Sequence, residues 1–127
     1  MAEGLFRTMV DDRSDEFMVA SAGISAIEGF PASEDTIRAM RDEGVDVSGH
    51  RSRRLTIPMI HEADRIFVME PMHRDYILGL YPEAVSKVSL LSEFGQAIPD
   101  PIRMSPAFYK STLDAIRQHL TKIVEEL

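Results

Sequence analysis

The most informative feature of this sequence is a residue that it does not contain. None of its 127 residues is cysteine, which excludes disulfides, thiolate metal ligands and cysteine nucleophiles. The four histidines stand at positions 50, 61, 73 and 119, and this separation does not match the ligand spacing of zinc sites. We therefore expect neither a metal site nor a bound cofactor.

Long apolar segments and an excess of basic charge are also missing. The longest apolar run is a handful of residues, far short of the roughly 20 that cross a bilayer. The N-terminus has no basic segment followed by an apolar one. The formal net charge is −7, whereas nucleic-acid backbones bind to basic surfaces. We expect a cytoplasmic protein that binds neither membranes nor nucleic acid.

Several widespread functional motifs are absent as well. The sequence has neither of the glycine-rich phosphate-binding patterns, G-x-x-x-x-G-K-[ST] and G-x-G-x-x-G. It also lacks the G-x-S-x-G pattern that carries the nucleophile of many serine hydrolases. What remains is a chain with 44% hydrophobic residues, a composition typical of ordinary globular proteins. Its length suits a single domain over 1–127 with one core.

Capping residues and apolar spacing predict five helices. The first spans 1–10, where Leu5, Phe6 and Met9 share one face but no capping residue precedes them. Three more follow the N-cap residues Ser33, Thr56 and Ser105, and one begins at Pro71. Gly44 is placed to end the second helix in the left-handed conformation. The last helix carries an apolar stripe at the three-four spacing: Leu113, Ile116, Leu120, Ile123 and Leu127.

Short apolar runs between these helices predict strands at 17–20, 65–69 and 88–91, with a further short extended piece at 45–47. Ile66, Phe67 and Val68 are consecutive, which indicates a parallel strand covered on both faces. Because the strands alternate with helices, we predict an α/β fold: a three-layer sandwich around a short, mostly parallel sheet.

Five segments, in this order and at fitting spacing, resemble the low-molecular-weight protein-tyrosine phosphatases. They are Met1–Arg7, Ser21–Gly23, His50–Thr56, Phe67–Glu70, and Asp100-Pro101 followed by Tyr109-Lys110. The resemblance covers essentially the whole chain. It implies that family's fold and its phosphomonoester hydrolysis through a cysteinyl-phosphate, with a phosphorylated protein or a small phosphate ester as substrate.

One part of the family pattern has no counterpart in this sequence. In the family, a strand and a Cys-x5-Arg-Ser/Thr loop precede the first helix. The thiolate attacks phosphorus, while the loop amides and the arginine stabilise the transition state. We therefore expect an N-terminally truncated member, with its first strand missing, that is inactive in this form. Because the lost strand would be central, we also expect self-association through exposed sheet edges.

Two other functions stay open at this point. A catalytically dead pseudophosphatase would act as a binding or regulatory module. The DNA upstream of the first codon would distinguish it from an active phosphatase whose start codon was assigned to an internal methionine. An arsenate reductase of similar fold needs several cysteines, which argues against that third reading. The sequence does not identify the substrate among phosphotyrosine, phosphoarginine and small esters.

The resemblance also assigns roles to single residues. Asp100 resembles the general acid that protonates the leaving oxygen, although an aspartate between two prolines is also common in solvated turns. Ser21 and His50 resemble residues of a hydrogen-bonded network behind the phosphate loop. Ile102 stands where the family usually has an aromatic residue, and Arg103 follows it, so we take both as substrate-loop candidates. Ile102 cannot stack on a phenyl ring.

Overall fold

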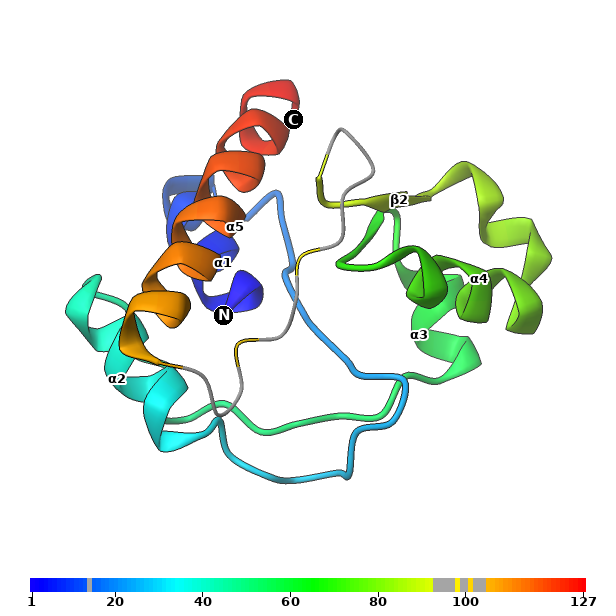
Figure 1. Ribbon diagram of the computed structural model, residues 1–127. Coiled ribbons are helices and arrows are strands. Elements are labelled where there is room, and N and C mark those ends of the chain that lie inside the picture. Colours follow the sequence, from blue (N-terminus) through cyan, green and yellow to red (C-terminus); the bar gives the residue numbers. More distant parts are fainter. Residues whose placement is uncertain (14, 93–97, 99–100, 102–104) are drawn as a thin grey trace.

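Helices lie on both sides of a small parallel sheet in the computed structural model, which describes residues 1–13, 15–92, 98, 101 and 105–127 (Figure 1). One helical layer contains α1 (Ala2–Met9), α2 (Glu34–Asp42) and α5 (Pro106–Glu126). The other contains α3 (Ile57–Glu62), α4 (Pro71–Leu80) and the 3-10 helix η2 (Pro82–Ser86); a further 3-10 helix, η1 (Asp11–Arg13), follows α1. This arrangement confirms the predicted α/β class.

The sheet consists of β1 (Ile66–Val68) and β2 (Val88–Leu90), which pair in parallel. Ile66 lies opposite Val88, and Val68 lies opposite Leu90. Side chains alternate between the two faces of a strand. Val68 therefore packs into the cluster formed with α3 and α4, while Phe67 packs against the cluster formed by α1, α2 and α5.

The predicted helix caps are present. The hydroxyls of Ser33, Thr56 and Ser105 each accept a hydrogen bond from the backbone N–H three residues later, at 3.2, 3.4 and 3.2 Å. Gly44 follows α2 with a φ of 78°, as expected for a helix end in the left-handed conformation. These local signals place α2, α3 and α5 correctly.

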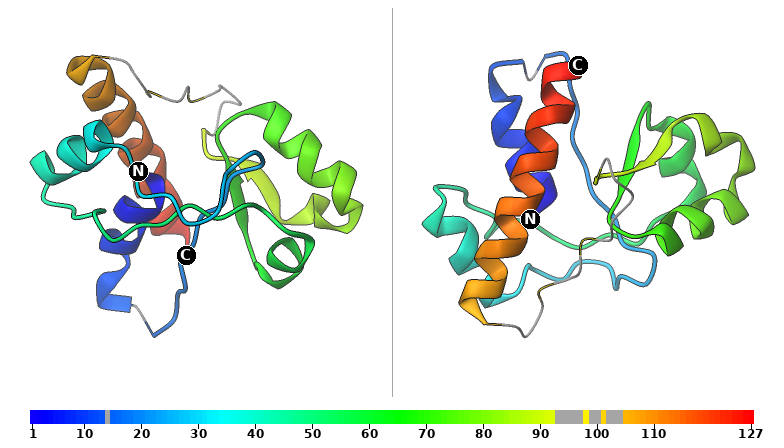
Figure 2. Two further views of the ribbon diagram at one scale, coloured as in Figure 1. Left: turned by 90° about the horizontal axis from the view of Figure 1, so that it is seen from below. Right: turned by 45° about the horizontal axis from the view of Figure 1, so that its top comes forward.

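The long helix α5 is the centre of the larger core. Its predicted apolar stripe is buried, apart from the partly buried Leu127, and it packs against α1 and α2. Figure 2 shows α1 alongside α5 in both views. None of the described helices is both long enough and apolar enough to span a membrane.

One strand prediction is wrong. Phe17–Ala20 is extended but forms no strand, and its Met18 side chain is 99% exposed. Residues 45–47, predicted as a short extended piece, lie in neither a helix nor a strand. β1 forms as predicted and packs on both faces, with Val68 buried in one cluster and the partly buried Phe67 against the other. The 17–20 segment has no strand partner, because among the described residues only β2 forms a ladder with β1.

Candidate functional site

The basic loop at 50–54 is fixed against the chain that follows the 17–20 segment. Gly23 N donates to Arg53 O at 2.9 Å, and Leu55 N donates to Gly23 O at 3.0 Å. Further along, Ser52 N donates to Phe30 O at 2.7 Å. These bonds place the loop beside the first turn of α1, where the two segments enclose a cleft of about 400 Å³.

Glu3 connects three segments at this cleft. Its Oε1 accepts a hydrogen bond of 2.8 Å from Ser21 Oγ. Its Oε2 lies 3.4 Å from the Arg7 guanidinium and 3.6 Å from His50 Nδ1. The Glu3 side chain is only 12% exposed, so these partners compensate a carboxylate that is largely removed from water.

Helix geometry explains why Glu3 occupies this position. Residues four apart lie on the same face of a helix, which brings Arg7 next to Glu3. A negative charge in the first turn also interacts favourably with the positive end of the helix dipole. Arg7 in turn donates to Val19 O at 2.7 Å. α1 is thereby joined to the segment that precedes Ser21.

Charged side chains of both signs line the cleft, with arginines in the majority. Arg7, Arg51 and Arg53 line it together with His50. α1 begins at its mouth without a side-chain cap, and the backbone N–H groups of a helix's first turn attract anions. Glu3 and Glu28 also line the cleft, so its field is mixed.

No hydroxyl at the described part of the cleft is placed as a nucleophile. Ser52 Oγ donates to Ile27 O and accepts from Phe30 N at 3.0 Å. Ser21 Oγ donates to Glu3, not to His50, whereas an activated serine is hydrogen-bonded to its base. The described part of the cleft therefore has groups that attract an anion but no group arranged to attack it.

The structure brings together two of the residues selected from the sequence. Ser21 and His50 both contact Glu3. Asp100, Ile102 and Arg103 lie outside the described residues. Sequence reasoning missed Glu3 as a site residue: the Glu3–Arg7 spacing signals a helical ion pair, but nothing local signals the contacts to Ser21 and His50.

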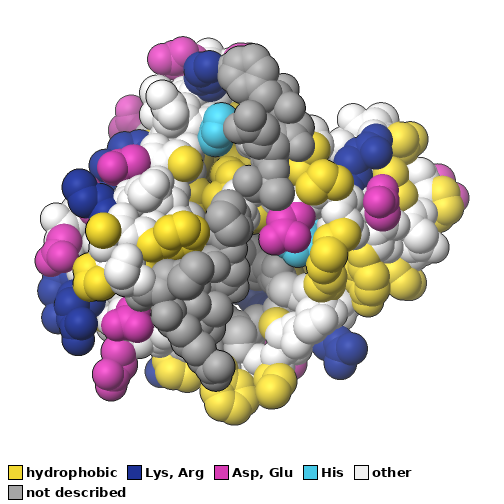
Figure 3. All heavy atoms as spheres, viewed as in Figure 1, with side chains coloured by type: hydrophobic (Ala, Val, Ile, Leu, Met, Phe, Trp, Pro, Cys, Tyr) yellow, Lys and Arg dark blue, Asp and Glu magenta, His cyan; other side chains and the backbone are white. Residues whose placement is uncertain are grey.

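Away from the cleft, the described surface mixes charges of both signs with exposed hydrophobic side chains (Figure 3). Met72 and Tyr76 of α4 are 59% and 41% exposed. No group of three or more acidic, histidine or cysteine side chains in the described residues is arranged to hold a metal ion.

Comparison with known proteins matches the whole chain to one family. The family model described as "Low molecular weight phosphotyrosine protein phosphatase" matches residues 1–127. The probable low molecular weight protein-tyrosine-phosphatase EpsP of Ralstonia nicotianae is 33% identical over 119 residues, covering 93% of this chain and 79% of the relative. A protein-arginine-phosphatase of Geobacillus stearothermophilus is 29% identical, covering 86% of this chain and 76% of the relative.

A solved structure agrees with the sequence matches. The low molecular weight protein tyrosine phosphatase from T. tengcongensis superimposes with a TM-score of 0.91 at 32% identity, covering 99% of this chain and 88% of that one. Matches in sequence and in fold thus extend over nearly the full chain. The chain belongs to the low-molecular-weight phosphotyrosine protein phosphatase family.

Proposed function

We propose that these 127 residues form a phosphatase-family scaffold that attracts phosphate groups but does not hydrolyse them. The observation that carries this proposal is the absence of cysteine from the sequence. Phosphoryl transfer to the protein needs an activated nucleophile, and the hydroxyls of the described cleft are bonded elsewhere.

The ligand class follows from the cleft and from the family. Arg7, Arg51 and Arg53 supply positive charge, and arginine side chains bind phosphate oxygens through paired N–H groups. The names of the relatives refer to both tyrosine and arginine phosphatases. We propose a phosphorylated protein or a small phosphate ester as the ligand, with Asp100 as a remnant general acid and Ile102 and Arg103 as contacts to it.

Activity on p-nitrophenyl phosphate tests this proposal. We expect the purified chain to release p-nitrophenol at the rate of the buffer alone, with no change on adding a thiol-blocking reagent. Asp100→Asn, purified in parallel, is the matched control because it removes the proposed proton donor and nothing else. Turnover by the original chain that is lost in Asp100→Asn would refute the proposal, whereas equal turnover by both would identify a contaminating phosphatase.

A binding or regulatory module is the second candidate function. The contacts of Glu3 with Ser21 and His50 favour it, because they connect α1 to the loops that line the cleft and none of them involves a cysteine. A cleft that is ordered without a nucleophile can bind a ligand without hydrolysing it. Saturable binding of inorganic phosphate, measured by calorimetry and lost in Arg53→Ala, would support this candidate. The expected missing first strand, the single domain and the cytoplasmic location stay predictions, and the genomic sequence upstream of the first codon tests the first of them.

A further inference from the structure

The outer face of α4 carries apolar side chains where a surface helix usually carries charged ones. Ile77 of this helix faces inward, is 2% exposed and belongs to the core cluster that includes Val68 of β1. Met72, Tyr76 and Leu80 instead remain 59%, 41% and 39% exposed. Residues four apart lie on one side of a helix. These three side chains therefore form one stripe along the outside of α4.

Gly79 lies next to this stripe, in the exposed last turn of α4. Glycine destabilises a helix relative to alanine, because it loses more backbone freedom on folding. A β-carbon at Gly79 would meet no described atom within 4 Å, so the packing of the described chain gives no reason for a glycine here. Glycine also lets another chain approach a helix closely. The residue thus points to a partner outside the molecule.

The stripe is complementary to a second copy of itself. Met72 precedes Tyr76 by four residues and Gly79 follows it by three, which at about 100° per residue puts both on the same side of Tyr76. In two antiparallel α4 helices related by a two-fold axis at Tyr76, Met72 of one copy therefore lies beside Gly79 of the other and fills the space that the glycine leaves. Leu80 lies against His73 in the same way. The two tyrosine rings meet at the axis, where aromatic rings attract each other.

We propose that two copies of this chain associate through the outer faces of their α4 helices as a weak two-fold dimer. The contact uses the same surface on both copies, so it closes at two subunits. Met72, Tyr76 and Leu80 expose roughly 300 Å² of apolar surface per copy, less than half of the about 800 Å² that each partner buries in a stable interface of standard size. The area therefore fits a transient dimer with a dissociation constant in the micromolar range or weaker.

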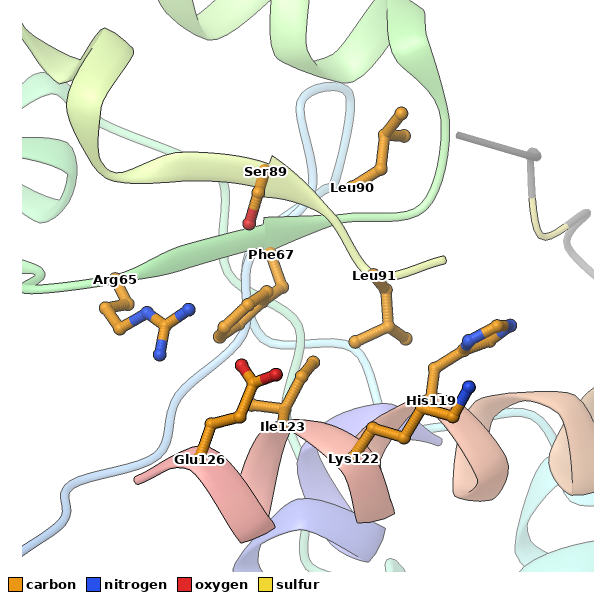
Figure 4. A pocket seen from close by; sticks show the side chains of 9 residues that line it. All are labelled: Arg65, Phe67, Ser89, Leu90, Leu91, His119, Lys122, Ile123 and Glu126. Carbon is orange, nitrogen blue, oxygen red and sulfur yellow. The ribbon is translucent and has the colours of Figure 1, made fainter. Parts of the chain in front are cut away.

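The sheet separates this face from α5 and from the cavity beside it. Phe67 of β1 and Ile123 of α5 line that cavity together with the charged side chains of Arg65 and Glu126, and its volume is about 140 Å³. Figure 4 shows these side chains between the sheet and α5, whereas α4 packs on the other face of the sheet. The contact through α4 therefore uses neither this cavity nor the anion-attracting cleft, and it does not depend on the proposed function.

Light scattering coupled to size-exclusion chromatography tests the dimer. As the concentration rises to about 1 mM, mass action should move the mass from 14.3 kDa toward twice that value. Tyr76→Lys places two like charges at the two-fold axis and should raise the dissociation constant at least tenfold. Ile27→Lys is the matched control, because Ile27 is 69% exposed but lies in a loop; its dissociation constant should stay within twofold of the original.

Gly79→Gln separates the contact from effects on folding. Glutamine is a better helix former than glycine, so this variant should unfold at a higher urea concentration when measured at low micromolar protein. Its side chain occupies the space proposed for Met72 of the other copy, so its dissociation constant should nevertheless rise at least tenfold. The proposal is overturned by a chain that stays monomeric up to about 1 mM, by equal weakening in Tyr76→Lys and Ile27→Lys, or by a Gly79→Gln chain that dimerises as well as the original.

Discussion

Replacing Gly4 by alanine measures how closely α1 approaches the core. In an unobstructed helix, alanine is more stable than glycine by about 1 kcal/mol, because glycine loses more backbone freedom on folding. At Gly4, however, a β-carbon would lie 2.8 Å from Val47 Cγ1 and 3.2 Å from Met40 Cε. The Val47 side chain is β-branched and restricted at χ1. Either α1 or residues 45–47 must therefore move to admit the methyl group.

Gly79 provides the matched control within the same chain. It lies in α4, and a β-carbon there meets no atom within 4 Å. We expect Gly79→Ala to raise the free energy of unfolding by about 0.5–1 kcal/mol. We expect Gly4→Ala to lower it by about 1–2 kcal/mol, the lower part of the range for overpacking, because Val47 is partly exposed and has some room to shift.

Urea unfolding of the two variants beside the original chain gives both values. The slope of free energy against denaturant should stay the same in all three, so that shifts in midpoint report stability. If Gly4→Ala stabilises the chain as much as Gly79→Ala does, the close approach of α1 to Val47 is wrong. Because Glu3 precedes Gly4, a displaced α1 should also weaken phosphate binding at the cleft, and Gly79→Ala should leave it unchanged.

Two further changes test other contacts. Hydrogen bonds from Arg117 and then Lys110 lower the pKa of Glu43 below its ordinary value of 4.5. The ionised Glu43 side chain therefore stabilises the fold at pH values above 4.5. In urea unfolding, Glu43→Gln should have a lower free energy of unfolding than the original chain at neutral pH, and this difference should disappear as the pH falls through the lowered pKa. The Tyr109 hydroxyl is buried without a partner among the described residues, so Tyr109→Phe should raise the free energy of unfolding by about 1 kcal/mol. Tyr81→Phe, which removes a 2.8 Å hydrogen bond to His61, should not raise it.

The helices were predictable because their start signals are local. A cap at Ser33, Thr56 or Ser105 bonds to an amide three residues away, so the sequence window that shows the cap also contains its partner. Gly44 likewise ends α2 through its own backbone conformation. In these places the prediction needed no knowledge of distant segments.

Strands were harder to predict because a strand exists only with its neighbour. The apolar run at 17–20 has the composition of a buried strand, yet it forms no strand and has no strand partner among the described residues, and its Met18 is exposed. β1 has the same kind of composition and forms, because β2 pairs with it. Composition thus identifies a segment that can enter a sheet, and the pairing partner decides whether it does.

The roles of side chains in the candidate site were also hard to predict, because they depend on contacts between residues far apart in the sequence. Ser21 and His50 were selected through the family resemblance, not from their surroundings, and Asp100 lies outside the described residues. Glu3 was missed because its importance lies in contacts to residues far along the chain. A carboxylate in a first helical turn has an ordinary explanation in the helix dipole, and only the fold shows that it also holds two loops.

Glu3 stabilises the walls of the cleft through contacts that take no part in phosphoryl transfer. One carboxylate on α1 bonds to Ser21 and lies beside Arg7 and His50, so α1, the segment before Gly23 and the basic loop are held together by charge and hydrogen bonds. None of these contacts requires a thiolate. The contacts that hold the described part of the cleft together therefore do not depend on a cysteine nucleophile. Selection for binding alone would act on Glu3 and the arginines, the residues that hold the cleft together and give it its positive charge.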